Sequence, residues 1–290
     1  WVYNPAGSFG PGRRALPAGD GLAVQKGEAG DTAATERFCD EVLRERAPAL
    51  ALLWLSEPDY TGHHAPLGSP EHRAAIASAD RNVRRVAETV ASLDPGGEET
   101  LLVVGSDHGM ESVEETIDLD ALLVAAGLKR APRSSEVVVA PNGTAAVLYF
   151  TEPEGRLVGD VARFLESEPW VGRVYAGGAL GEIGLPTGSP AQVAISLKAD
   201  DRANPYGVPG HSHIVRDSLE PKEVTGFGQH GGLGRHEQQP FLFIQGGGFA
   251  PGIYRDSSSL IDIAPTVLRH LGLPANGLDG RALPRQPTIA

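Results

Sequence analysis

Short apolar runs alternate with stretches of helical spacing along this chain. The three clearest runs are residues 49–55 (ALALLWL), 101–104 (LLVV) and 241–244 (FLFI). Runs of this length without polar positions are typical of strands that are covered on both faces of a sheet. We therefore predict three buried core strands, each followed by polar or glycine-rich residues.

Helices are predicted before, between and after these runs. Asp31 is a candidate N-cap for a helix that ends near Arg46, Ser69 caps a second helix with Pro70 at its first position, and Ser259 caps a third. Apolar positions in the second helix recur at intervals of three, four and seven residues and predict one buried stripe: Ile76, Val83, Val86, Val90 and Leu93.

Strands that alternate with helices favour an α/β fold with a doubly wound, mostly parallel sheet. Residues 117–224 differ, because they combine short strand-like runs (137–140, 145–150 and 193–197) with a helix near 159–166 and many Pro and Gly residues. We interpret this segment as an inserted α+β cap subdomain. The core would then comprise residues 31–116 and 225–290, after an irregular lead-in at 1–30.

Composition limits the possible functions. The 290 residues are 41% hydrophobic and 21% charged, which is typical of a globular protein, and no apolar run is long enough for a membrane span. The net charge of −12 argues against binding to a nucleic-acid duplex. An acidic protein that acts on an anionic substrate needs local positive charge, which bound cations can supply.

The chain contains a single cysteine, Cys39, so an intrachain disulfide and a cysteine-rich zinc site are excluded. Its position in a predicted helix favours a small buried side chain. One cysteine slightly favours the cytoplasm, but the sequence leaves the compartment, like the oligomeric state, open.

Metal-binding residue types lie next to all three predicted core strands. Asp59 and His63 lie in EPDYTGH after the first, Asp107 and His108 lie in SDHGM after the second, and His230 lies in GQHGGL ahead of the third. Each cluster alone is compatible with a solvated turn. Together they predict a site for two divalent ions at the carboxyl end of the sheet, because oxygen and imidazole ligands suit zinc or manganese.

At these motifs the sequence resembles the alkaline phosphatase superfamily, and specifically its nucleotide pyrophosphatase/phosphodiesterase branch. The segments that carry the resemblance are SEPDYTGH (56–63), LGSPEHRAAIASAD (67–80), SDHGM (106–110), QHGGL (229–233) and SLIDIAPTVLRHLGL (259–273). The resemblance extends from about residue 40 to the end of the chain and is loose through residues 117–224.

The resemblance implies one metal ion, most simply zinc, held by Asp59, His63 and His230, and a second held in part by Asp107 and His108. His236 is a weaker candidate than His230, because the family's ligand precedes Gly-Gly. His64, His72 and His270 match no ligand position. His211 and His213 lie in the cap segment, where contact with substrate is an open alternative without support from the motifs.

The resemblance also implies hydrolysis of phosphodiesters or nucleotide pyrophosphates through a phosphoryl-enzyme intermediate on a Thr or Ser. That nucleophile is not found here, since Ser8 is the only serine before residue 40 and nothing around it suggests activation. We therefore expect the N-terminal part of the family's core to be absent from this sequence, leaving the second metal site incomplete.

Alternatives remain open. A related phosphonate, phosphomonoester or sulfate hydrolase, or a mutase, would use the same ligands, and an inactive metal-binding module would use them without catalysis. The expected partner is a small anionic phosphate-ester substrate. Asn142, between two predicted strands, is a candidate for substrate contact, although a turn role is the simpler interpretation.

Overall fold

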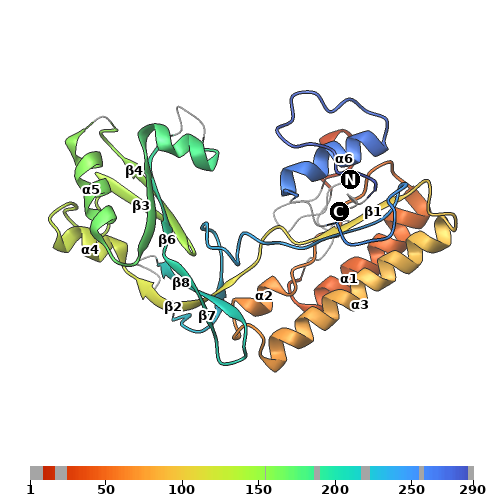
Figure 1. Cartoon of the computed structure of the whole chain (residues 1–290), viewed down its shortest axis with the longest axis horizontal. Helices are drawn as coiled ribbons and strands as arrows, with labels where there is room; N and C mark the ends of the chain where they lie inside the picture. The colour runs from red at the N-terminus through yellow and green to blue at the C-terminus, as the bar shows by residue number, and fades with distance from the viewer. Residues whose placement is uncertain are drawn as a thin grey trace. The chain divides into compact units, whose positions relative to one another are not determined.

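A computed structural model shows the chain as two compact units, which are described separately below (Figure 1). Unit 1 comprises Trp1–Tyr60, Ala74–Asp107 and Phe241–Ala290, and unit 2 comprises Thr61–Arg73 and His108–Pro240. The structure describes residues 9–16, 25–153, 155–185, 190–216, 223–254 and 258–286. Ser8 therefore lies outside the described residues.

Unit 1 consists mainly of helices and one short sheet. Its elements are η1 (Pro11–Arg13), α1 (Glu28–Arg37), η2 (Phe38–Arg46), most of α3 (Pro70–Leu93), β1 (Leu101–Gly105), β10 (Leu242–Gly246), η4 (Leu260–Asp262) and α6 (Ile263–His270). Strands β1 and β10 pair antiparallel, with Leu101 opposite Gly246. The short helix α2 (Asp59–Gly62) runs from unit 1 into unit 2.

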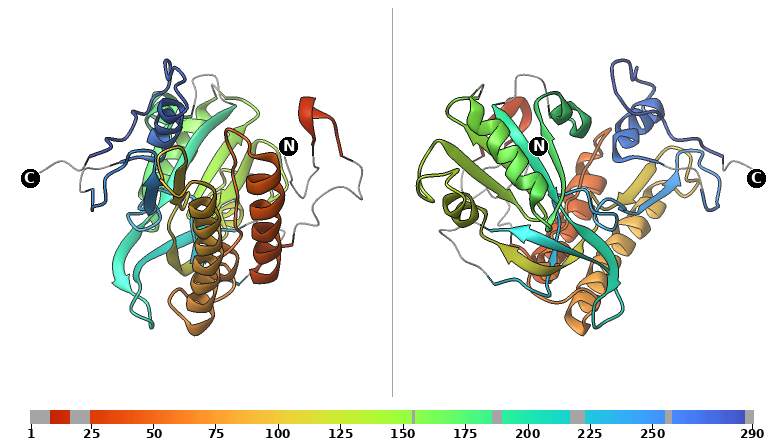
Figure 2. Two further views of the ribbon diagram at one scale, coloured as in Figure 1. Left: turned by 90° about the vertical axis from the view of Figure 1, so that its right-hand side faces the viewer. Right: turned by 60° about the vertical axis from the view of Figure 1, so that its left-hand side comes forward.

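Helices α1 and α3 lie side by side, as the left view of Figure 2 shows. Ion pairs join them on the surface, Arg81 to Glu28 at 2.7 Å and Arg85 to Glu36 at 2.6 Å. The Ser69 hydroxyl accepts a hydrogen bond from the backbone N–H of His72, as predicted for an N-cap.

The predicted buried stripe of α3 is largely wrong. Val86 is buried, but Ile76 and Leu93 are 46% and 51% exposed. The buried face instead carries small and polar residues: Ala75, Ser78, Asn82, Val86 and Thr89. Apolar spacing therefore located the helix but chose the wrong face.

The prediction of a buried strand at residues 49–55 is also wrong. No strand is formed there, and Leu50, Leu52 and Trp54 are 64%, 77% and 70% exposed. A strand needs a neighbour that pairs with its backbone groups, and none does so among the described residues of unit 1. An apolar run indicates that a segment could be buried in a core, but burial also requires other elements that cover it.

The helix predicted to begin at Asp31 starts earlier, at Glu28. Asp31 is buried and does not act as its cap. Its carboxylate accepts hydrogen bonds from the backbone N–H groups of Ser56 and Glu57, both at 2.8 Å. The acidic residue therefore anchors the segment that precedes Asp59 rather than the helix end.

The described residues of unit 2 form two four-stranded sheets, with strand orders β3-β4-β6-β5 and β7-β8-β2-β9. The strands are β2 (Glu111–Ile117), β3 (Val137–Asn142), β4 (Ala145–Phe150), β5 (Val171–Ala176), β6 (Ala191–Leu197), β7 (Ala199–Ala203), β8 (Pro209–Val215) and β9 (Gly228–Gln229). The helices are α4 (Leu119–Ala125), α5 (Arg156–Ser167) and η3 (Gly177–Ile183).

The core of unit 2 lies between the first of these sheets and the helices α4 and α5 (Figure 2, right). Leu119 and Leu123 of α4 and Leu165 of α5 are completely buried there. On the opposite face of the sheet, Leu180 of η3 packs with Tyr175 and Ala194 in a smaller cluster. The predicted strands at 137–140, 145–150 and 193–197 and the helix at 159–166 all form.

The α/β class is confirmed, but the strand directions differ from the parallel arrangement predicted. Among the described strands, β2 and β8 pair in parallel and the remaining pairs are antiparallel. An apolar run such as LLVV contains no information on the direction of its neighbour, so this property had no local signal. In the part of the chain that the structure describes, no helix is long and apolar enough to cross a bilayer.

Candidate metal centre

Three histidines from distant parts of the sequence meet in unit 2. His63 directly follows α2, His108 lies between β1 and β2, and His230 directly follows β9. The rings of His108 and His230 stack with their centroids 3.4 Å apart and their planes 18° from parallel. The ring of His63 lies 5.2 Å from that of His230. Three of the predicted ligands are therefore brought together within one compact unit.

The pairing of β2 with β9 explains part of this convergence. Glu111 lies opposite Gln229 and Ser112 opposite Gly228, which brings the residues just before β2 beside those just after β9. His108 precedes β2 by three residues, and His230 follows β9 immediately. The antiparallel register thus juxtaposes two histidines that are separated by more than a hundred residues.

Close packing around Met110 brings the His63 segment to the same place. A Cβ atom on Gly62 would lie 2.6 Å from the sulfur of Met110, and one on Gly228 would lie 3.0 Å from it and 2.6 Å from Leu67. Neither glycine can be replaced without moving its neighbours. The glycines of the two histidine motifs therefore serve close backbone approach.

Hydrogen bonds to carbonyl groups orient two of the rings. His63 Nδ1 lies 3.1 Å from the carbonyl oxygen of Gly228, and His108 Nδ1 lies 2.9 Å from that of Gly109. Because a carbonyl oxygen only accepts, Nδ1 must carry the proton, and in the neutral ring Nε2 then carries the lone pair. This arrangement is the usual one for metal-binding histidines. Ligand-type nitrogens of His108 and His230 lie within 4.8 Å of each other.

The two predicted carboxylate ligands belong to unit 1. Asp59 begins α2 and is half-buried, four residues before His63, whereas Asp107 is exposed and directly precedes His108. Asp31 holds the segment before Asp59 through its bonds to Ser56 and Glu57. The placement of both carboxylates toward the histidines stays a prediction.

The histidines that matched no ligand position have other contacts. His72 accepts a hydrogen bond from the backbone of Gly68, and His211 and His270 bind carbonyl oxygens. His236 Nε2 lies 2.7 Å from Asp201 Oδ1, so this ring has a carboxylate partner of its own. His64 is exposed.

Asn142 lies at the tip of the β3–β4 hairpin, where its side chain donates a hydrogen bond to the carbonyl oxygen of Gly231 at 3.2 Å. This contact supports the turn interpretation and adds a link to the loop that carries His230. Substrate contact by Asn142 is untested and stays a prediction.

Two carboxylates are buried behind this loop. Glu237 accepts four hydrogen bonds, whereas Glu111 Oε1 accepts one, from the backbone N–H of His236, and its Oε2 has no partner among the described residues. Burial raises the pKa of Glu111 to about 7, and the negative charge of Glu237 acts in the same direction.

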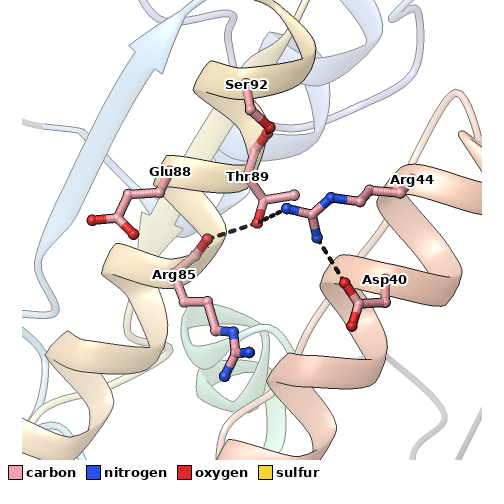
Figure 3. A pocket seen from close by; sticks show the side chains of 6 residues that line it. All are labelled: Asp40, Arg44, Arg85, Glu88, Thr89 and Ser92. Carbon is pink, nitrogen blue, oxygen red and sulfur yellow. Dashed lines mark hydrogen bonds and ion pairs between the residues drawn. The ribbon is translucent and has the colours of Figure 1, made fainter.

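A separate hollow of about 370 Å³ lies in unit 1 between η2 and α3 (Figure 3). Arg44 and Arg85 line it, but Arg44 binds Asp40 at 2.7 Å and Arg85 binds Glu36 at 2.6 Å. Glu88 adds further negative charge. These contacts neutralise the cationic groups, so the hollow lacks the charge of a phosphate site and contains none of the predicted ligands.

A cluster of oriented histidines beside strand ends defines an α/β protein with a candidate site for divalent metal ions. The chain belongs to the family of type I phosphodiesterases and nucleotide pyrophosphatases, whose model matches residues 23–175, slightly more than half of the chain. The resemblance to the nucleotide pyrophosphatase/phosphodiesterase branch inferred from the motifs is thereby confirmed.

Two curated relatives are similar in sequence. Alkaline phosphatase PhoD of Zymomonas mobilis is 24% identical over 271 residues, which cover 84% of this chain and 46% of the relative. Human ectonucleotide pyrophosphatase/phosphodiesterase family member 7 is 36% identical over 66 residues, 23% of this chain and 14% of the relative. The chain thus spans less than half the length of either relative.

Solved structures show the same fold. Murine ectonucleotide pyrophosphatase/phosphodiesterase 5, an inactive form in complex with AMP, matches with a TM-score of 0.60 and 18% identity over 91% of this chain and 63% of that chain. Phosphonoacetate hydrolase of Sinorhizobium meliloti, in complex with phosphonoacetate, matches with a TM-score of 0.53 and 16% identity over 75% and 50%.

Two features of the site were missed from the sequence. Met110 is the only methionine of the chain and directly follows the SDHG motif, which was a signal that it packs at the site. Glu237 lies in the polar stretch GRHEQQ, where nothing distinguishes a buried carboxylate from a solvated one. Its role becomes evident only from its hydrogen bonds.

Proposed function

We propose that this protein hydrolyses phosphodiester or nucleotide-pyrophosphate bonds with the help of two divalent metal ions, zinc or manganese. The convergence of His63, His108 and His230 carries the proposal, because three motifs that are distant in sequence supply rings to one place. Membership of the type I phosphodiesterase family supports the reaction class.

In this proposal one ion is held by Asp59, His63 and His230, and the second in part by Asp107 and His108. The donor set fits such ions, since imidazole nitrogens and carboxylate oxygens suit zinc and manganese. Because Nδ1 of His63 and of His108 donates a hydrogen bond to a backbone carbonyl oxygen, Nε2 of each ring is the nitrogen available to bind metal. When bound, the ions supply positive charge for the phosphate oxygens and lower the pKa of the attacking hydroxyl.

The protein's own residues bind and orient in this scheme. The net charge of −12 would repel an anionic ester, so the histidine cluster must attract it through the ions that it holds. The nucleophile stays unassigned: a Thr or Ser that forms the phosphoryl intermediate is expected outside the motifs of this chain.

The test compares His230→Ala with His236→Ala. Metal content of each purified variant is measured by elemental analysis before and after chelation, with turnover of bis-p-nitrophenyl phosphate on the same samples. His230→Ala should lose at least half of the bound metal and reduce turnover at least 100-fold, since a ligand is removed. His236→Ala should stay close to the parent, because His236 pairs with Asp201.

Each outcome bears on the proposal. Metal-dependent turnover that disappears only in His230→Ala supports it. Full activity of a folded His230→Ala protein contradicts the ligand assignment. Bound metal without turnover of the diester, p-nitrophenyl phosphate or phosphonoacetate contradicts hydrolysis by this chain alone, and it fits either an inactive metal-binding module or a hydrolase core without its nucleophile. Preferential turnover of phosphonoacetate moves the substrate class to phosphonates.

A further inference from the structure

We infer that Glu237 is a positioning residue that fixes the loop carrying His230, and this inference rests on the proposed metal site. Glu237 is 1% exposed. Its Oε2 accepts hydrogen bonds from the backbone N–H groups of Gly231 and Gly232 at 2.7 and 3.0 Å, and its Oε1 accepts one from Gly234 at 2.8 Å. One carboxylate thus binds three of the four residues that follow His230.

Other residues of unit 2 form hydrogen bonds with further backbone groups of this loop. The N–H of Leu233 donates to Ser196 Oγ at 2.9 Å, so each backbone N–H from 231 to 234 has a side-chain acceptor. On the carbonyl side, Thr144 N–H donates to the oxygen of His230 at 3.3 Å. The loop forms no helix or strand of its own, and these side chains take the place of regular secondary structure.

Thr144 connects Glu237 to the β3–β4 hairpin. Its hydroxyl donates to Glu237 Oε2 at 2.7 Å and accepts from the N–H of Gly232 at 2.7 Å. Both Thr144 and Glu237 are buried, so water does not compete for these bonds. The hairpin, the carboxylate and the loop therefore form one hydrogen-bonded network.

The network requires an ionised carboxylate. Its two oxygens accept four hydrogen bonds, and all four partners are donors. A glutamine has the same shape but replaces one oxygen by an NH₂ group, which would face at least one donor. Glu237→Gln should therefore loosen the loop without leaving a cavity, and His230 should lose its fixed position.

The closing experiment measures two properties of Glu237→Gln: affinity for Zn²⁺ by equilibrium dialysis, and amide hydrogen exchange of residues 229–234 in metal-free protein. We expect affinity to fall 10- to 100-fold, the usual effect of removing a group that orders a metal ligand. Exchange in the loop should become at least tenfold faster, while exchange in α5 stays unchanged.

Two controls separate positioning from general destabilisation. Asp120→Asn disrupts the buried pair with Lys129 (2.6 Å) elsewhere in unit 2, and it should leave both Zn²⁺ affinity and loop exchange unchanged. Thr144→Val should reproduce part of the Glu237→Gln effect, because it removes the hydroxyl, and Thr144→Ser should restore the parent values.

The outcomes are distinguishable. Unchanged affinity and loop exchange in folded Glu237→Gln would overturn the inference, as would an equal loss of affinity in Asp120→Asn. If the parent chain binds no Zn²⁺, the proposed metal site fails. Amide hydrogen exchange of residues 229–234 in metal-free protein would then still show whether Glu237 holds the loop.

Discussion

The two units differ in how far their apolar side chains are buried. Among its described residues, unit 2 buries fifteen apolar side chains in a single cluster, including Leu119, Leu123 and Leu148 at 0% exposure. In unit 1 the buried apolar residues among those described are Cys39, Ala75, Val86 and Pro265, while large side chains such as Leu52 and Trp54 are more than two-thirds exposed. Similar apolar runs are therefore buried in unit 2 and exposed in unit 1.

The difference shows what an apolar run can predict. Residues 145–150 lie in a sheet with neighbours on both sides and helices on one face, so their apolar side chains have partners. Residues 49–55 are equally apolar but have no strand neighbour among the described residues. Contiguous exposed apolar surface usually marks a place of contact, which makes the segment at 49–55 the part of unit 1 most worth testing.

The largest effect is expected for Leu148→Ala in unit 2. Removing a fully buried leucine should lower the free energy of unfolding by about 2–5 kcal/mol, through lost transfer energy and the cavity left behind. Urea unfolding followed by tryptophan fluorescence measures it, because Trp170 lies in the same cluster. Leu52→Ala is the matched control and should change stability by less than about 0.5 kcal/mol. Equal losses of unfolding free energy in the two variants would contradict the difference in burial between the units.

A pH-dependent effect of up to about 3 kcal/mol is expected from Glu111. Its pKa is about 7 in the folded protein and about 4.5 when unfolded, so the folded state binds more protons between these values. Stability should therefore fall as pH rises from about 4.5 to 7 and change little from this group above that.

Urea unfolding of Glu111→Gln at pH 5, 6, 7 and 8 tests this effect. Glutamine does not titrate, so the decline should be smaller than in the parent. If the stability of the parent and that of Glu111→Gln changed with pH to the same extent, the buried carboxylate of Glu111 would not be the cause of the decline.

An intermediate effect is expected in unit 1 for Asp31→Ala. The variant removes the acceptor of the Ser56 and Glu57 amides and of the Ser56 hydroxyl at 3.0 Å. Leaving these donors without their acceptor should cost about 1–3 kcal/mol. Thermal unfolding gives the cost, and amide exchange at residues 56–57 shows where it arises.

Asp40→Ala is the control for this prediction. Asp40 forms an exposed pair with Arg44, which is worth about 0–1 kcal/mol. If both variants cost the same, the segment before Asp59 is not anchored by Asp31 as the geometry indicates.

The smallest effect on stability is expected for the double variant Leu52→Ser, Trp54→Ser. Both side chains are exposed, so the free energy of unfolding should change by less than about 0.5 kcal/mol. Any self-association of the parent in sedimentation velocity should nevertheless decrease in the variant, because apolar surface has been removed. A marked loss of stability would mean that these residues are covered in solution.

The sequence predicted local structure best where a segment and its partners lie close together. The strand at 145–150 and the helix capped by Ser69 both form as predicted. The helix capped by Ser259 forms too, with the Ser259 N–H donating to Asp262 at 2.9 Å. These features depend on turns, caps and alternation, which are encoded within a few residues.

Long-range features were predicted less well. His63, His108 and His230 could be selected from their motifs, but the buried face of α3 depends on which helix packs against it. The acceptor role of Glu237 depends on a glycine loop and a hairpin nearly a hundred residues apart. Such properties belong to the contact between segments, and no single segment encodes them.

The glycine at 234 has a consequence for the evolution of this family. A Cβ atom there would lie 2.3 Å from both carboxylate oxygens of Glu111, so any side chain at 234 is incompatible with that carboxylate in its present position. The two positions should therefore be coupled among homologues: sequences that keep Glu at 111 should keep Gly at 234, and sequences with a side chain at 234 should lack Glu at 111. A set of homologues with Glu at 111 and Ala at 234 would show that this part of the fold can rearrange.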